Sequence, residues 1–347
     1  MGDADIINMS ERAAAKADEG ARCKATTASG RPCRNDAMAG SDYCSVHAPD
    51  DVAEVAAEGT RSPVDDARDV VGQAVSGLGA FIQRRLKGDY EIDDFGYDRE
   101  LSRNVLLPVG KPLYENYFRI RTLGITRIPS EGPALLVGNH SGTIALDAVM
   151  MSYAVATEHP AERVVRNVAA DLVFQLPVIG PVARKAGNVV ACDEDALELL
   201  HRGELVGVFP EGYKGVGKGW RDRYRLQRFG RGGFMEIALR ARVPIIPVAI
   251  VGAEEAYPMI GDLGPVARAF GFPYFPVTPT FPWLGPLGLI PFPSKWVIEF
   301  GDPIPMDEYP EDAAEDPMLV FDLSDSIRDT IQQMIYRNLK LRGSAFF

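Results

Sequence analysis

Short apolar runs alternate with longer amphipathic stretches through the middle of the chain. The runs ALLVGNH, GNVVAC, LVGVFPEG and PIIPVAIVG each end at a polar turn, as expected for buried strands. The stretches ALDAVMMSYAVA, DALELLHRGE and GGFMEIALRAR have helical spacing. The segment YFRIRTLGITRI, at residues 117–128, is interpreted as a further strand. Strands that alternate with helices predict an α/β fold, with a central mixed sheet flanked by helices.

Two amphipathic helices are predicted on either side of this region. From Asp65, apolar residues recur at helical spacing as far as Leu86. We expect this helix either to pack on the main domain or to lie on a membrane. Near the C-terminus, Asp316 is a good N-cap, followed by a first-turn proline and by an apolar stripe that ends at Ile335.

These patterns divide the chain into five parts. They are a flexible N-terminus at 1–20, a small cysteine-containing module at 21–48, an acidic linker at 49–64, the amphipathic helix and its connection at 65–104, and a main domain at 105–347. The two N-terminal stretches around the module are rich in small and acidic residues, a composition typical of flexible segments.

Composition and charge limit the classes of protein to consider. The chain has 347 residues, of which 46% are hydrophobic, enough for one large core or two smaller ones. Its apolar runs fall short of the ~18 residues of a spanning helix, and its start, MGDADIINMS, does not resemble a signal peptide. The net charge of −11 argues against a nucleic-acid partner. We therefore expect a cytoplasmic protein.

Three cysteines and a histidine near the N-terminus form a candidate metal site. Cys23, Cys33, Cys44 and His47 follow the pattern C-x9-C-x10-C-x2-H, which resembles small Cys3His modules found at protein termini. Three thiolates and one imidazole suit tetrahedral zinc. A module of this size has too little core to fold without its metal. We expect a structural zinc ion here, the alternative being cysteines without metal.

Candidate catalytic residues follow two of the predicted strands. His140 comes directly after the ALLV run, and Asp147 lies seven residues beyond it. The second strand ends in FPEG, which places Glu211 at its end, with Lys214 shortly afterwards. Strand ends expose side chains to ligands in α/β folds. A histidine there can act as a base, with a nearby carboxylate to orient its ring.

Four blocks in this order resemble the motifs of the glycerolipid acyltransferase family, which contains the lysophosphatidic acid acyltransferases. The blocks are NHSG with its later Asp, GNVVACDED, FPEG and VPIIPVAIVG. The resemblance implies that His140 is the catalytic base, that Asp147 supports it, and that the block of Glu211, Gly212 and Lys214 helps to bind the acceptor. It implies an acyl-CoA or acyl-carrier-protein (acyl-ACP) donor and, by default, lysophosphatidic acid as acceptor. Neither a metal nor a cofactor is needed for the transfer.

Two features depart from the pattern of this family. The spacing of seven between His140 and Asp147 is longer than usual, and two helical turns would separate them by about 10.5 Å. The two side chains can meet only if SGT forms an irregular turn before the helix. Asp193 and Glu194 stand where the family commonly has a phosphate-binding arginine, and Arg184 is a candidate substitute. A neutral mono- or diacylglycerol is therefore an alternative acceptor.

Basic and apolar segments outside these motifs suggest contacts with lipid. Residues 214–231 contain seven basic side chains, among which Lys218 and Arg221 are candidate ligands for lipid headgroups or for the phosphates of coenzyme A. The alternative is a solvated basic surface. Residues 270–294 contain no charge, seven aromatic residues and seven prolines. The prolines exclude a spanning helix, so we expect a loop that dips into a membrane interface or packs on the core.

These observations together predict an O-acyltransferase that modifies a glycerolipid while bound peripherally to the inner face of the cytoplasmic membrane. A hydrolase that uses Ser141 is one alternative, although the G-x-S-x-G spacing of such enzymes is missing. A lipid-binding scaffold with an inactive acyltransferase domain is another, and the altered spacing of His140 and Asp147 is its main support.

Overall fold

The computed structural model describes residues 24–25, 32–33, 42, 81–88, 90–230 and 232–346. The chain divides into two compact units, Met1–Gln83 and Arg84–Phe347, and the second contains the fold described below. Residues 81–87 are helical, whereas the rest of the helix predicted from Asp65 lies outside the described residues.

The predicted zinc module also lies mostly outside the described residues. Of its four candidate ligands, Cys33 is described and buried. Cys23, Cys44 and His47 are not among the described residues, so zinc binding at this site stays a prediction.

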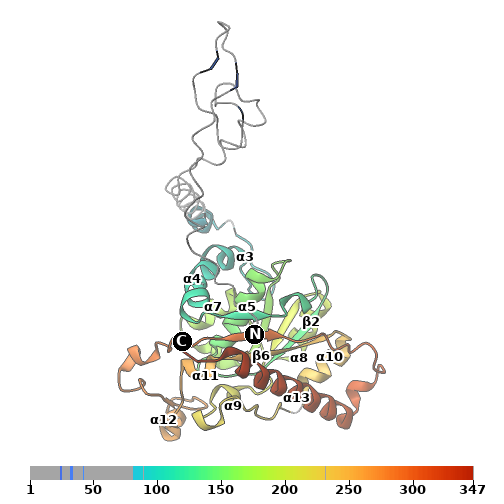
Figure 1. Cartoon of the computed structure of the whole chain (residues 1–347). Coiled ribbons are helices and arrows are strands. Elements are labelled where there is room, and N and C mark those ends of the chain that lie inside the picture. The colour runs from blue at the N-terminus through green and yellow to red at the C-terminus, as the bar shows by residue number, and fades with distance from the viewer. Residues whose placement is uncertain are drawn as a thin grey trace, which may run out of the picture. The chain divides into compact units, whose positions relative to one another are not determined.

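A seven-stranded sheet forms the centre of the second unit, in the order β1-β9-β6-β2-β5-β3-β4 (Figure 1). Its strands are β1 Arg121–Leu123, β2 Ala134–Gly138, β3 Val165–Ala169, β4 Val189–Val190, β5 Leu205–Val208, β6 Ile245–Val251 and β9 Val297–Phe300. Neighbours from β6 to β4 pair in parallel, whereas β9 is antiparallel to β6 and parallel to β1. The predicted mixed sheet is confirmed.

Strand β2 lies at the centre of the sheet and is buried on both faces. Leu135 pairs with Val206 of β5 on one side and with Ile245 of β6 on the other. The side chains of β2 alternate between two hydrophobic cores, with Leu135 in one and Leu136 in the other. This double burial explains why the strand appears in the sequence as a continuous apolar run.

Helices cover both faces of the sheet. One core contains residues of α5, Leu146–Glu158, and the other contains residues of α8, Asp193–His201, α10, Gly233–Ala241, and α13, Pro317–Arg342. The remaining helices are α3 Arg99–Leu101, α4 Leu107–Pro112, α6 Asp171–Gln175, α7 Ile179–Lys185, α9 Tyr213–Val216, α11 Ala253–Ala256 and α12 Gly264–Ala269. Short helical turns are η2 Ser102–Leu106, η3 Leu113–Tyr117, η4 Ile125–Arg127, η5 Trp220–Asp222, η6 Gly285–Leu289 and η7 Ala313–Glu315. A separate hairpin pairs β7, Gly261–Asp262, with β8, Pro276–Val277.

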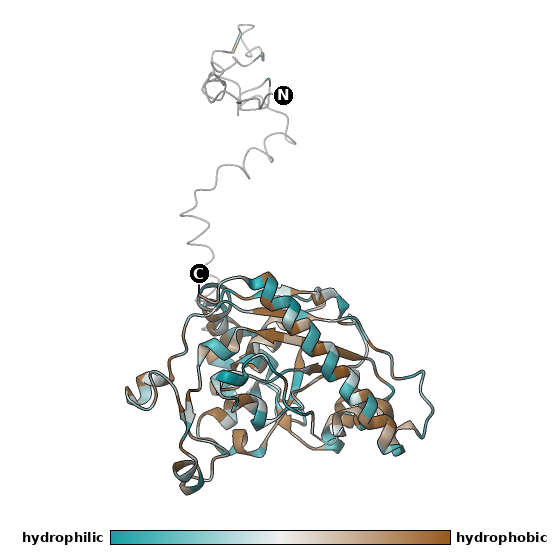
Figure 2. Ribbon diagram, turned by 60° about the horizontal axis from the view of Figure 1, so that its bottom comes forward, coloured by the Kyte–Doolittle hydropathy of each residue, from teal (hydrophilic) through white to brown (hydrophobic). Residues whose placement is uncertain are grey.

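The predicted C-terminal helix is present with its predicted cap. The Asp316 side chain accepts hydrogen bonds from the amides of Met318 and Leu319. The apolar stripe of α13 packs into the core, with Ile331 fully buried. In Figure 2 polar and apolar residues alternate along this helix, as an amphipathic surface helix requires.

The predicted strand at 117–128 is wrong for most of its length. Only β1 is extended, because residues 113–117 are helical and the strand ends before Gly124. Gly124 has a φ of +70°, and an added Cβ there would lie 2.3 Å from the carbonyl oxygen of Phe300. The chain therefore turns at Gly124, where a continued strand would need a negative φ.

Candidate active site

His140 lies at the carboxyl end of β2, next to a buried side-chain clamp. The Asn139 side chain donates to the carbonyl oxygen of Ile250 on β6 at 2.8 Å and accepts from the Ile250 amide at 2.7 Å. Asn139 is fully buried, and these bonds satisfy polar groups that burial would otherwise leave unpaired. They also tie the backbone next to His140 to the neighbouring strand.

An irregular turn connects His140 to α5. Gly142 and Thr143 have φ values of +91° and +60°, and α5 begins only after this turn. Asp147, in the first turn of α5, is thereby brought back to the histidine, with Oδ2 2.8 Å from His140 Nδ1. The long spacing is therefore compatible with a direct contact, through the kind of turn that the sequence required.

The Asp147 carboxylate fixes the tautomer of His140. Asp147 is fully buried, and its Oδ2 also accepts a hydrogen bond from the Ser141 amide at 2.7 Å. Because an ionised carboxylate only accepts hydrogen bonds, His140 Nδ1 carries the proton and Nε2 keeps its lone pair. The imidazole packs against Phe209 with 4.7 Å between ring centroids. The arrangement leaves Nε2 as the atom that can take a proton from a substrate.

Glu211 is the hub of a second group of hydrogen bonds. Its buried carboxylate accepts from the His140 amide at 2.9 Å, from Lys218 Nζ at 3.0 Å and from the Gln227 amide at 2.5 Å. Through the Glu211 carboxylate, the His140 amide at the end of β2 is joined to Lys218 and Gln227, which both lie after α9. The described contacts of Glu211 favour a positioning role, and its direct contact with an acceptor stays a prediction.

Two glycines allow the chain after Glu211 to approach His140 closely. Gly212 has a φ of +55°, in the region that glycine adopts without strain. At Gly215, on α9, an added Cβ would lie 2.8 Å from the His140 carbonyl oxygen and 2.9 Å from its Cβ. A residue with a side chain would therefore displace either α9 or residues 139–145 between β2 and α5, here termed the His140 loop. The sequence analysis did not identify Gly215, because an isolated glycine gives no signal of such an approach.

The remaining predicted binding residues are not gathered at one place. Lys218 is buried in its ion pair with Glu211, whereas Lys214 and Arg221 are exposed. Arg184, on α7, stacks on Phe174, with 5.0 Å from its guanidinium carbon to the ring centroid. The structure thus brings together His140, Asp147, Glu211 and Lys218 among the described residues, but not Arg184.

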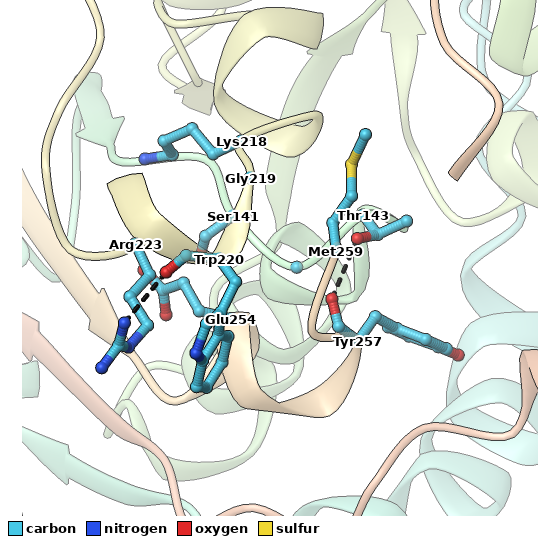
Figure 3. Close-up of a pocket in the computed structure, with 10 residues that line it drawn as sticks. Ser141, Thr143, Lys218, Gly219, Trp220, Arg223, Glu254, Tyr257 and Met259 are labelled. Carbon is cyan, nitrogen blue, oxygen red and sulfur yellow. Dashed lines mark hydrogen bonds between the residues drawn. The ribbon is translucent and has the colours of Figure 1, made fainter. Parts of the chain in front are cut away.

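A small pocket lies beside the His140 loop. Three segments line it: residues 141–143 of that loop, residues 218–223 after α9, and residues 254–259 after β6 (Figure 3). The Thr143 hydroxyl donates to the carbonyl oxygen of Tyr257 at 3.0 Å, which joins the first segment to the third. The sequence analysis missed the third segment, although its carboxylates follow directly after the VPIIPVAIVG strand.

One backbone amide of the loop is available to a ligand. The Ser141 amide donates to Asp147, and the Thr143 amide donates to the carbonyl oxygen of Val216. Among the described residues, the Gly142 amide has no acceptor, and Gly142 lines the pocket. This N–H group can therefore stabilise negative charge that develops on a substrate oxygen.

The described part of the chain contains no cluster of histidine, cysteine, aspartate and glutamate side chains arranged to hold a metal ion. The groups at this site are an oriented imidazole, a buried carboxylate and an available amide.

Comparison with known proteins assigns part of this region to a family. The family model Acyltransferase matches residues 119–251, which include β2, β5 and β6. A search of solved structures finds the 1-acyl-sn-glycerophosphate (LPA) acyltransferase PlsC from Thermotoga maritima, with a TM-score of 0.46 and 17% identity over 79% of this chain and 93% of that chain.

Relatives in sequence include mycobacterial and vertebrate proteins. An uncharacterized protein of Mycobacterium tuberculosis is 50% identical over 292 residues, which cover 84% of this chain and 82% of the relative. An uncharacterized protein of Mycobacterium leprae is 50% identical over 288 residues, covering 83% and 77%. A bovine protein named DGAT1/2-independent enzyme synthesizing storage lipids is 27% identical over 225 residues, covering 64% of this chain and 60% of that protein.

Proposed function

We propose that the chain, of which residues 119–251 match the Acyltransferase family model, moves a fatty acyl group from an acyl thioester, acyl-CoA or acyl-ACP, to a hydroxyl of a glycerolipid. The observation that carries this proposal is the 2.8 Å contact between His140 Nδ1 and Asp147 at the carboxyl end of the central strand. The contact leaves Nε2 free to accept a proton, which is the requirement for a general base.

The reaction follows from these groups. His140 Nε2 takes the proton of the acceptor hydroxyl as its oxygen attacks the thioester carbonyl carbon. The negative charge that forms on the carbonyl oxygen is stabilised by the Gly142 amide. The carbon–sulfur bond then breaks, and the leaving thiolate receives the proton from the imidazolium. The ester oxygen of the product is the former hydroxyl oxygen of the acceptor.

Asp147 acts through His140. Its carboxylate holds the ring in the tautomer that exposes Nε2 and stabilises the imidazolium while the proton is held. General-base catalysis by a positioned side chain typically contributes about 10²–10⁴ in rate.

The resemblance to the family indicates a glycerolipid acceptor but leaves two classes of glycerolipid open. Lysophosphatidic acid is the default acceptor of the resemblance, and neutral mono- or diacylglycerol is the alternative. The name of the bovine relative refers to storage lipids, which favours a neutral acceptor.

An exposed apolar surface supports action at a membrane. Residues 260–294, here termed the apolar lobe, project around α12 at the lower left of Figure 1. Within the lobe, Trp283 is 71% exposed, Phe270 is 69% exposed and Leu287 is 68% exposed. An apolar surface with an exposed tryptophan suits a membrane interface. We propose that the lobe inserts into the lipid surface.

The apolar lobe adjoins the pocket. The Tyr274 hydroxyl donates to the Thr143 carbonyl oxygen at 2.6 Å, and the Tyr257 hydroxyl donates to the Leu289 carbonyl oxygen at 2.7 Å. A lipid held at the lobe would therefore lie next to the His140 loop. None of the helices formed by the described residues has both the length and the hydrophobicity to cross a membrane.

The proposal is tested with the purified full chain, acyl-CoA and acyl-ACP as donors, and lysophosphatidic acid and monoacylglycerol as acceptors. We expect acylated product with at least one pair. Release of free fatty acid in place of acylated lipid would favour a hydrolase, and Ser141→Ala should then abolish turnover. Under the acyltransferase account Ser141→Ala retains measurable transfer. Absence of turnover with every pair contradicts the proposal and favours a lipid-binding scaffold.

A further inference from the structure

Two oxygen atoms of residues that line the pocket have no hydrogen-bond partner within the described part of the chain. Ser141 Oγ and Glu254 Oε1 are both buried and make no hydrogen bond within the described residues. Ser141 directly follows the catalytic histidine, and Glu254 lies on α11, directly after β6. Buried polar atoms are nearly always paired, so two unpaired oxygens at one pocket point to a ligand that supplies the missing partner.

The two cations that line the pocket, Lys218 and Arg223, both make contacts within the protein. Lys218 Nζ donates to both carboxylate oxygens of Glu211 and to the Arg225 carbonyl oxygen at 3.2 Å. These contacts use the three donors of an ammonium group. Figure 3 shows Arg223 turned toward the Trp220 carbonyl oxygen, to which it donates at 2.9 Å while stacking on the Trp220 ring. Lys218 therefore has no donor left for a phosphate, whereas Arg223 uses one of its five N–H groups in the bond to Trp220.

The unpaired oxygens are complementary to a hydroxyl group. An ionised carboxylate only accepts hydrogen bonds, and a phosphate oxygen that faces it would place two acceptors and two negative charges together. A hydroxyl can donate to a carboxylate and can also accept from a serine, whereas a phosphate oxygen that carries no proton can only accept. A monoacylglycerol carries such a second hydroxyl next to the one that reacts, whereas lysophosphatidic acid carries a phosphate there.

We infer that Glu254, with Ser141, forms the subsite for the head of the acceptor and selects a free hydroxyl over a phosphate. The inference rests on the proposed function and specifies its substrate class as an acyl acceptor with a second, uncharged hydroxyl. Glu254 is a specificity-determining residue in this account, and the proton transfer remains with His140.

The electrostatics of Glu254 agree with this role. Burial and the adjacent Glu255 carboxylate raise the pKa of Glu254 to about 7, against the opposing influence of Lys218. Glu255 is itself neutralised in part by an ion pair with Arg342. At pH 8 Glu254 is therefore mainly ionised and accepts hydrogen bonds, and selection against phosphate should be strongest there.

The test compares kcat/KM for monoacylglycerol and lysophosphatidic acid with the same acyl chain, at pH 8. The full-length wild type, Glu254→Gln and Ser141→Ala are measured, with Glu131→Gln as the matched control because Glu131 is exposed before β2. Glu254→Gln replaces a carboxylate oxygen by an amide that can donate to phosphate. Glu254→Gln should lower the ratio of kcat/KM for monoacylglycerol to kcat/KM for lysophosphatidic acid about tenfold or more. Ser141→Ala should lower this ratio by less.

Each outcome decides the inference. A wild type that prefers monoacylglycerol, together with the reduced ratio in Glu254→Gln, supports it. A wild type that prefers lysophosphatidic acid overturns it, as does a ratio in Glu254→Gln within twofold of the control. If Glu254→Gln does not fold, Ser141→Ala replaces it in the comparison. A reduced ratio in Ser141→Ala supports the inference, and a ratio equal to that of the control overturns it. Transfer to neither acceptor by the wild type overturns the proposed function itself and the inference with it.

Discussion

Two buried carboxylates beside the His140 loop have opposite surroundings. Asp147 is surrounded by donors: His140 Nδ1 at 2.8 Å, the Ser141 amide at 2.7 Å and the Ala148 amide at 2.8 Å. Glu254 accepts from the Gly252 amide at the longer distance of 3.3 Å and has a second carboxylate, that of Glu255, next to it. Burial and a neighbouring negative charge disfavour the ionised form of Glu254. The first carboxylate is suited to orienting a base and the second to recognising a ligand.

The raised pKa of Glu254 predicts a specific dependence of stability on pH. Its value in the folded protein, about 7, exceeds the ordinary value of 4.5, so the folded state binds the proton more tightly than the unfolded state. The contribution of Glu254 to the free energy of unfolding is therefore fully present below about pH 4.5 and is lost as pH rises to 7. Relative to wild type, the free energy of unfolding of Glu254→Gln should rise by roughly 2.5 kcal/mol between pH 5 and pH 8.

Denaturant unfolding of both proteins at several pH values measures this difference. Glu131→Gln is the control, and it should follow the wild type. If the difference in free energy of unfolding between Glu254→Gln and wild type is the same at pH 5 and pH 8, the pKa of Glu254 is not raised, and this prediction is wrong.

At the residue scale the sequence singled out His140 and Asp147 as a candidate pair but did not give the geometry of their contact. His140 and Asp147 follow from a recognisable motif. Their contact depends on positive φ values at Gly142 and Thr143, and threonine has no intrinsic preference for that conformation. The turn is instead held by tertiary hydrogen bonds from Thr143 to Val216 and Tyr257. Glu254 was not predicted because the feature that singles it out is its burial beside the pocket, which a local pattern of residues does not reveal.

Among the secondary-structure elements, α9 packs directly against the His140 loop. It packs on that loop through Gly215, and an added Cβ would also lie 2.6 Å from the Glu211 Cβ. Gly215→Ala should therefore move the loop and weaken both the Glu211 and the Asp147 contacts. We expect kcat to fall by about 10²-fold, since a misplacement of about 1 Å at a catalytic group has effects of that size.

Steady-state kinetics with the best acceptor measure this effect. The control is Gly233→Ala at the start of α10, where an added Cβ has no atom within 4 Å. The account of α9 would be contradicted if Gly215→Ala were as active as Gly233→Ala, provided that both proteins unfold cooperatively.

The elements that the sequence predicted are those with uniform patterns. Strands β2, β5 and β6 are apolar throughout, and the cap and stripe of α13 are both local signals. Strand β3 was not predicted, because it contains Arg166 and Asn167. Both are buried, and Arg166 donates to Asp93 at 2.7 Å and to the Gly187 carbonyl oxygen at 2.9 Å. Because these partners of Arg166 are distant in sequence, a local pattern of residues does not predict that Arg166 can be buried in a strand.

For the whole molecule, the apolar lobe predicts how the protein meets lipid. The double variant Trp283→Ser/Leu287→Ser should bind vesicles of phosphatidylglycerol and phosphatidylcholine about tenfold or more weakly, because each side chain loses over 1 kcal/mol of burial in the membrane. Tyr336→Ser is the control, as Tyr336 is an exposed aromatic residue on α13. Vesicle cosedimentation measures the binding. Equal binding of the double variant and the control would exclude the lobe as the membrane contact.

The N-terminal module should be separable from catalysis. The C-x9-C-x10-C-x2-H pattern predicts about one zinc ion per chain, lost in Cys23→Ser/Cys44→Ser. Deletion of residues 1–60 should leave acyl transfer largely intact, because the residues assigned to chemistry all lie later in the chain. Metal analysis of protein purified under reducing conditions tests the first statement, and a zinc-free chain would refute it. A folded but inactive deletion variant would refute the second.

The most direct test of the account is the rate of acyl transfer by His140→Ala, measured with the best donor and acceptor of the wild type. His140 is mostly buried against Phe209, so its fold should be checked by thermal unfolding before the rates are compared. The account predicts a fall in kcat of at least about 100-fold, because the general base is removed. A folded His140→Ala enzyme that transfers acyl groups at the wild-type rate would contradict it.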